Sequence, residues 1–178
     1  MNNQIPDDFF DTIINRAGTG SIKYAPAMFG KPADIIPMWV ADMDFKVPPA
    51  VTAALKTAAE HAIFGYSHSG SEYDTALCNW FKTRHNWNIK PGWNVQTPNV
   101  LFALTAAIHA FTKTGDAVMI CQPVYPPFEQ IILGAKRTLV INNLKLENNK
   151  YYIDFNAFEN DIRKNNVKMF VLCSPITP

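Results

Sequence analysis

The sequence predicts an α/β protein in which an N-terminal arm precedes a mostly parallel sheet flanked by helices. Three short apolar runs without alternation, at 117–121, 138–142 and 167–173, are typical of strands buried on both faces. Helical patterns at about 127–135 and 156–165 separate these runs. Connections of this length are long enough to join parallel neighbouring strands. The second half of the chain is therefore predicted to alternate between strands and helices.

The first 47 residues are expected to form the arm, because prolines and glycines interrupt every long periodic pattern there. One short helix is expected near residues 9–16. From Pro49, a residue suited to the first position of a helix, apolar residues recur at helical spacing as far as Ala62. This pattern predicts the first long helix.

Two further helices are expected before the first strand, the second over residues 100–113 with Gly115 as a left-handed stop. Capping boxes, in which a capping residue precedes Glu by three positions, predict where two helices begin: Ser69 with Glu72, and Asn156 with Glu159.

Composition excludes several classes of partner. The 178 residues carry 16 Lys and Arg against 15 Asp and Glu, a net charge of +1, without a basic stripe, which argues against nucleic acid. No apolar run reaches the roughly 18 residues that a membrane span needs, and the start lacks the pattern of a signal peptide. We therefore expect a cytoplasmic protein without a membrane partner.

Ligands of open parallel sheets bind beyond the carboxyl ends of the strands, which directs attention to the proline-rich loop 122–128. Tyr125 on this loop could stack on a planar heterocycle, or it could fill a gap between loop and helix. The turn before residue 100 would leave the amides of Asn99, Val100 and Leu101 free to hold an anion. Every helix start has such free amides, so this pattern alone does not distinguish an anion-binding site from an ordinary helix start.

Metal binding, nucleotide binding and catalysis by paired carboxylates have less support in the sequence. The four histidines show no metal-ligand spacing, and a nucleotide-binding module lacks a glycine-rich phosphate loop. Asp42 and Asp44 are expected to hold a loop by accepting backbone hydrogen bonds, with paired catalytic carboxylates as the alternative. No metal site is predicted.

Four blocks in order resemble the PLP (pyridoxal 5′-phosphate)-dependent cystathionine β-lyases of the class I/II aminotransferase fold. They are VADMDF, IFGYSHSG, TPNVLFALTAAIHAFTKTGDAVMICQPVYPPF and VLCSP. The resemblance implies fold type I, with residues 1–47 as the arm and start of the small-domain region. Residues 48–178 would then be the front part of the large PLP-binding domain, with an incomplete sheet.

The resemblance also implies roles for single residues. Asn99, Val100 and Leu101 match the turn that holds the cofactor phosphate, and Tyr125 matches the aromatic residue on the pyridine ring. Tyr66 matches a tyrosine that reaches the phosphate of the neighbouring subunit, which implies a homodimer. Asp42 lies in the block at the substrate entrance. Two further substrate-side candidates are Tyr24 and Trp39.

The reaction implied is β-elimination from a cystathionine-like or cysteine-S-conjugate amino acid, giving a thiol, pyruvate and ammonia. Transamination is the alternative on the same fold. The alternative outside the enzymes is a non-catalytic remnant, which would bind phosphate or pair with a full-length subunit.

The sequence departs from the family after the VLCSP block, where Thr177 stands in place of an asparagine that contacts the cofactor. None of the lysines has Ser or Thr three residues before it, so the Schiff-base lysine of the family motif is absent. We expect these 178 residues to be a truncated and inactive front part, uncovered at its last strand. One deleted base would convert Pro-His-Asn-Pro into residues 175–178, and a truncation without a frameshift is the other hypothesis.

Overall fold

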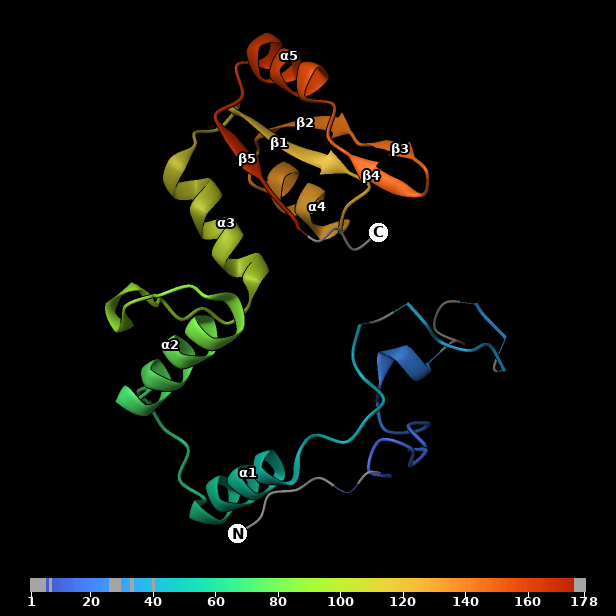
Figure 1. Ribbon diagram of the computed structural model, residues 1–178, viewed down its shortest axis with the longest axis vertical. Coiled ribbons are helices and arrows are strands. Elements are labelled where there is room, and N and C mark those ends of the chain that lie inside the picture. Colours follow the sequence, from blue (N-terminus) through green and yellow to red (C-terminus); the bar gives the residue numbers. More distant parts are fainter. Residues whose placement is uncertain (1–5, 7, 26–29, 33, 40, 175–178) are drawn as a thin grey trace. The chain divides into compact units, whose positions relative to one another are not determined.

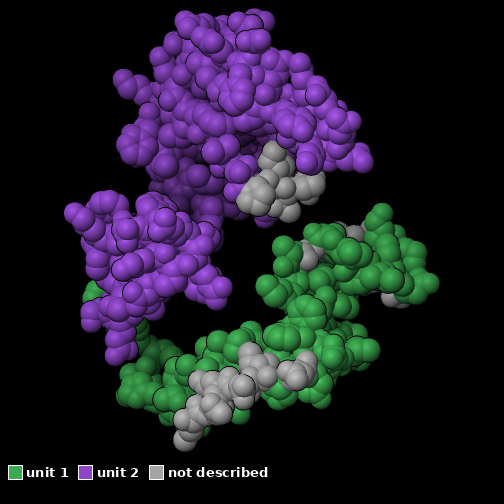
Figure 2. Space-filling view, in the orientation of Figure 1, with its two compact units in different colours: residues 1–68 green, residues 69–178 purple. Residues whose placement is uncertain are grey.

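The computed structural model describes residues 6, 8–25, 30–32, 34–39 and 41–174. The chain divides into two compact units, residues 1–68 and 69–178, which Figure 2 distinguishes by colour. The domain division expected between residues 47 and 48 stays a prediction, because compact units and family domains divide a chain by different criteria. Within the described ranges, no helix has the length and apolar character that crossing a bilayer requires.

The first unit holds a short 3₁₀ helix, η1 (Ile22–Tyr24), and the helix α1 (Pro49–His61), which begins at the proline predicted to open it. The helix expected near residues 9–16 is wrong. Isolated turns occur there instead, with the amides of Phe9 and Asp11 donating to the carbonyls of Pro6 and Asp8. Consecutive β-branched residues follow, which disfavour a helix.

In the second unit, α2 (Ser71–His85) is followed by the 3₁₀ helix η3 (Pro91–Trp93). The capping box expected at Ser69 is wrong, because Gly70 occupies the cap position and makes no side-chain bond to the helix. Ser69 lies one residue too early for its hydroxyl to satisfy the first helical amides.

The next helix, α3 (Val100–Phe111), ends two residues before the predicted limit. Its last residues lead into a tight turn, in which Gly115 has a φ of +87°. The left-handed conformation predicted for this glycine is therefore confirmed, although it closes the turn rather than the helix.

Three parallel strands form the sheet in the order β2–β1–β5. Their bounds are β1 (Ala117–Gln122), β2 (Thr138–Asn143) and β5 (Met169–Val171), and the helices between them are α4 (Pro127–Gly134) and α5 (Phe155–Asn165). Figure 1 shows α3 and α4 on one face of this sheet and α5 on the other. The predicted fold class, an α/β chain with parallel strands, is confirmed.

Alternation along β1 divides the core between these two faces. Val118 and Ile120 pack with Ile108 of α3 and with Phe128 and Ile132 of α4. The intervening residues of β1, together with Val140 of β2, pack against the apolar side of α5. All six residues of β1 lie in the parallel ladder to β2.

Two features of this half were not expected from the sequence. An antiparallel hairpin, β3 (Lys145–Glu147) with β4 (Lys150–Tyr152), turns through Asn148 and Asn149, which both have positive φ. The capping box expected at Asn156 is also wrong. Asp154 caps α5 instead, and its carboxylate accepts the amides of Asn156 and Ala157 at 3.1 and 3.2 Å.

Candidate functional site

The turn that opens α3 is held by its own polar side chains. Asn99 is the cap residue, and its side-chain oxygen accepts the amide of Phe102 at 2.9 Å. The hydroxyl of Thr97 donates to the carbonyl of Asn99 at 3.1 Å. These two bonds fix the direction in which the first turn of the helix points.

Helical geometry offers no acceptor to the amides of Val100 and Leu101, which are the first two of the helix. The side chain of Val100 is exposed, whereas that of Leu101 packs against the core beneath the helix. Two N–H donors at the positive end of a helix dipole can receive an anion such as a phosphate group.

Tyr125 lies on the loop between β1 and α4, beyond the carboxyl end of the central strand. The loop leaves the strand through a cis bond between Gln122 and Pro123. Phe128 is buried beneath this loop and meets the ring of Tyr125 edge to face, with centroids 5.7 Å apart. Tyr125 itself remains 48% exposed, so one part of its ring faces solvent.

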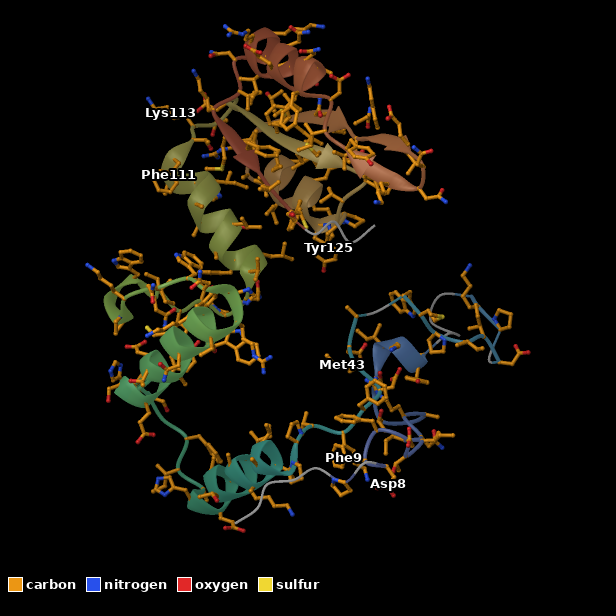
Figure 3. All side chains as sticks on the ribbon, viewed as in Figure 1. Asp8, Phe9, Met43, Phe111, Lys113 and Tyr125 are labelled. Atoms are coloured by element: carbon orange, nitrogen blue, oxygen red, sulfur yellow. The ribbon has the colours of Figure 1, made fainter. Side chains whose placement is uncertain are left out.

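The fold brings the turn at Asn99 and the loop of Tyr125 to the same edge of the sheet. The chain passes from the carboxyl end of α3 directly into the amino end of β1, and Ile108 near that end of α3 packs on Val118 and Ile120. Helix and strand therefore run in opposite directions, which places the start of α3 at the edge where β1 ends. In Figure 3, Lys113 after α3 and Tyr125 lie at opposite ends of this part of the molecule.

The arm contains a cluster of four charged residues within the first unit. Arg16 pairs with the carboxylates of both Asp42 and Asp44, the second at 2.6 Å. Lys23 donates to Asp44 at 2.7 Å and to the carbonyl of Asp42 at 2.9 Å. The expectation of backbone donors is corrected here, because side-chain cations hold both carboxylates.

The charges in this cluster shift one another's protonation. The hydrogen bonds from Lys23 and then from Arg16 lower the pKa of Asp44 to about 2. Asp42 and Asp44 in turn raise the pKa of Arg16. Asp44, held by both cations, is a poor proton acceptor, and Asp42 is paired with Arg16, which argues against the alternative of a catalytic pair.

Tyr24 and Trp39 line one cavity of about 640 Å³ in the arm. Its wall is mainly apolar and includes Ile35, Ile36, Pro37 and Met38, with Lys23, Lys31 and Asp34 as its charged members. Arg16 stacks on the ring of Tyr24, with its guanidinium carbon 5.2 Å from the ring centroid. The structure therefore brings together the three substrate-side candidates, because Lys23 joins the cavity to Asp42.

The remaining candidates are not brought into these groups by any described contact. Tyr66 is fully exposed on the loop after α1 and belongs to the first unit, whereas Asn99 and Tyr125 belong to the second. Thr177 lies outside the described residues. Among the residues that are described, no three His, Cys, Asp or Glu side chains gather as metal ligands would.

Sequence reasoning missed Thr97, Arg16 and Lys23. A Thr-Pro-Asn run before a helix is a signal for the first, since hydroxyl and amide side chains fix turns of this kind. For the two cations, the signal is that Asp42 and Asp44 lie among apolar residues in the short block WVADMDF. Such carboxylates need positive partners when the block folds.

The chain has the α/β fold of the type I PLP enzymes, as comparison with solved structures shows. The model of the class I and II aminotransferase family matches residues 33–178, so the chain belongs to that family.

Individual relatives show how much of such a protein the chain spans. It is 39% identical to the cystathionine β-lyase PatB of Bacillus subtilis and 31% identical to the protein MalY of Escherichia coli, over 95% of this chain and 44% of each relative. The crystal structure of cystalysin from Treponema denticola, which contains pyridoxal 5′-phosphate, is 34% identical with a TM-score of 0.87, over 98% of this chain and 45% of that one. The chain thus spans less than half the length of these relatives.

The geometry at the start of α3 fits a phosphorylated ring. Two amides without helical acceptors suit a phosphate group, and the half-exposed ring of Tyr125 at the same edge suits a flat heterocycle. A cofactor of this shape is therefore compatible with the residues present.

Proposed function

We propose that this chain forms the front part of a PLP-dependent carbon–sulfur β-lyase that acts on cystathionine-like or cysteine-S-conjugate amino acids. The single observation that carries the proposal is the common edge shared by the α3 start and Tyr125. Relatives named as cystathionine β-lyases support this reaction class over transamination, the competing outcome on this fold.

In this proposal, the amides of Val100 and Leu101 bind the cofactor phosphate, and Asn99 holds the turn that presents them. Tyr125 lies against the face of the pyridine ring, and the edge contact with Phe128 keeps its plane fixed. When bound, PLP supplies a sink for the electron pair released as the substrate Cα loses its proton. The chain's own residues bind and orient the group that does this chemistry.

The substrate side of the proposal rests on the arm. Tyr24 and Trp39 would shape the mainly apolar cavity that receives the thioether part of the substrate. Asp42 would act by holding Arg16 in place over Tyr24 rather than by moving a proton.

Assembly and location belong to the same proposal. Tyr66 would reach the phosphate site of a second subunit in a homodimer, which is consistent with its full exposure. Thr177 would lie beside the cofactor in place of the family's asparagine. We expect a cytoplasmic enzyme. We also expect the 178 residues by themselves to release no pyruvate from cystathionine, because no lysine occupies the family motif.

Pyridoxine 5′-phosphate tests the proposed cofactor site without aldehyde chemistry, because it cannot form a Schiff base with lysine. Titration into the 178-residue chain, followed by calorimetry, should show saturable binding at one site. Asn99→Asp and Asn99→Ser form a matched pair, since both residues cap helices well. The added carboxylate should weaken binding at least about tenfold by repelling the phosphate, whereas Ser should change it by less than about threefold.

Two results would overturn the proposal. One is the absence of saturable binding by the wild-type chain. The other is equal affinity in the two Asn99 variants, which would mean that the phosphate does not lie at the start of α3.

A further inference from the structure

Arg137 is a buried cation, 7% exposed, that lies between the carboxyl ends of two helices. Its Nε donates to the hydroxyl of Thr112 at 2.9 Å, and Nη2 donates to the carbonyls of Thr112 and Ile108 at 2.7 and 3.4 Å. Nη1 donates to the carbonyl of Ala135. Thr112 is the carboxyl-terminal cap of α3, and Ala135 is that of α4.

The charge of Arg137 is therefore balanced by helix ends. The three carbonyl oxygens it meets, those of Ile108, Thr112 and Ala135, lie at the negative ends of helix dipoles, where a cation is favourable. A guanidinium group suits this position because its planar fork can bond to several oxygens at fixed angles. The side chain thus joins α3 and α4 at the amino edge of the sheet.

The backbone around Arg137 strengthens the same junction. Its amide donates to the carbonyl of Ile132 in α4 at 3.1 Å. The neighbouring carbonyl of Lys136 accepts the amide of Gly115 at 2.9 Å, and the Thr138 hydroxyl donates to the carbonyl of Gly115 at 3.1 Å. The turn after α3 and the turn after α4 are consequently bonded to each other.

The opposite ends of these two helices carry the two parts of the proposed cofactor site, the turn at Asn99 and the ring of Tyr125. Asn99 caps the start of α3, and Tyr125 lies two residues before the start of α4. A helix of 12 residues is about 18 Å long, so a small rotation at one end displaces the other by a larger distance. The clamp at Arg137 therefore controls the spacing between the anion-binding amides and the ring of Tyr125.

We propose that Arg137 is a positioning residue for the proposed cofactor site, which acts by clamping the carboxyl ends of α3 and α4. The inference deepens the proposed function and rests on it. Arg137, at the amino edge of the sheet, would thus set the geometry of a site that lies at the carboxyl edge.

The test compares Arg137→Met, Arg137→Lys and Ile162→Ala in the 178-residue chain. Ile162 packs on the other face of the sheet, so its truncation should lower stability without touching α3 or α4. Arg137→Met should weaken pyridoxine 5′-phosphate binding by about tenfold, as loss of supporting residues commonly does, with Arg137→Lys intermediate. Ile162→Ala should leave the affinity of the folded chain unchanged.

Amide hydrogen exchange provides a readout that does not need the ligand. Arg137→Met should speed exchange in α3 while leaving α5 and β2 near wild type, whereas Ile162→Ala should speed exchange in α5. Uniform acceleration in Arg137→Met would overturn the proposal, because Arg137 would then contribute only global stability. Faster exchange in α3 with unchanged affinity would overturn it as well.

The two proposals fail in distinguishable ways. If the wild-type chain does not bind pyridoxine 5′-phosphate, the proposed function is wrong at this site, and the inference that rests on it falls with it. If the wild type binds and Arg137→Met binds equally well, only the role of Arg137 is wrong.

Discussion

Tyr125 meets Phe128 edge to face, with ring centroids 5.7 Å apart and planes inclined by 86°. Phe128 is 8% exposed and belongs to the core, so it forms a rigid support for the half-exposed tyrosine. The free part of the Tyr125 ring is available to a second flat ring at the carboxyl edge of the sheet.

This contact predicts that the aromatic face of Tyr125, and not its hydroxyl, contributes to binding of pyridoxine 5′-phosphate. Tyr125→Phe should keep the affinity within about threefold, and Tyr125→Ala should weaken it about tenfold, since a stacked ring contributes on the order of 1–3 kcal/mol. Calorimetric titration of the variants measures both effects. Leu133→Ala, at an exposed position on α4, is the control for loss of apolar surface. An equal loss in Phe and Ala variants would show that the hydroxyl is the binding group.

The sequence predicted the bounds of β1 and β2 well, because each begins as an unbroken apolar run. Burial on both faces is confirmed for β1 but is wrong for β2, which alternates between buried and exposed residues. The sequence predicted the start of α1 because Pro49 restricts the backbone there. It did not predict which polar residue caps α5, since Asp154 and Asn156 are both good caps. Asp154 prevails because its carboxylate also accepts Lys145 from the hairpin, a contact that no local pattern contains.

The site could be predicted only in part, because contacts between residues far apart in the chain leave no local sequence pattern. Asn99 and Tyr125 follow local rules for helix starts and strand ends. By contrast, the partners of Asp42 and Asp44 lie about 20 to 28 residues earlier in the chain. Arg137 reaches Thr112 across 25 residues, so its role depends on how two helices pack.

The cluster around Asp44 predicts a pH-dependent arm. The pKa of Asp44 is lowered to about 2, so the stability from its ion pairs is complete above the unfolded value near 4. It is lost as the pH falls through about 2. Asp44→Asn should therefore speed amide exchange of residues 16–24 at pH 7, and the difference from wild type should shrink toward pH 2.

Asp11→Asn is the control for this prediction, because it removes the same charge from an exposed position in the arm. It should leave exchange of residues 16–24 unchanged. High salt should reduce the Asp44 effect, since these groups are accessible to screening ions. If Asp11→Asn speeds exchange as much as Asp44→Asn, net charge rather than the ion pairs holds the arm.

The hairpin predicts a clear response to substitution at Asn149. Asn148 and Asn149 have φ values of +50° and +58°, as a two-residue turn between twisted strands requires. Asn149→Gly should preserve or slow amide exchange in β3 and β4, whereas Asn149→Val should destabilise the hairpin by about 1–2 kcal/mol. Asn143→Val, at an exposed strand position, controls for the side chain itself. Equal exchange in the Gly and Val variants would contradict the assigned turn.

Asn142 joins the sheet to α5 through a buried polar contact. It is 2% exposed, its amide donates to the carboxylate of Asp161 at 2.8 Å, and its oxygen accepts the thiol of Cys121 at 3.9 Å. Burial raises the pKa of Cys121, which keeps the proton on the sulfur so that it can donate.

This contact predicts that Asp161→Ala will destabilise the chain by about 1–3 kcal/mol, because it leaves the buried Asn142 amide without its acceptor. Asp161→Asn should cost less, since its side-chain oxygen can still accept that bond. Glu159→Ala is the matched control on the same helix: Glu159 pairs with Arg163 at 2.6 Å on an exposed face, and such pairs contribute at most about 1 kcal/mol. Urea unfolding of the three variants measures the differences. If Asp161→Ala costs no more than Glu159→Ala, solvent satisfies Asn142 and α5 is held to the sheet by its apolar side alone.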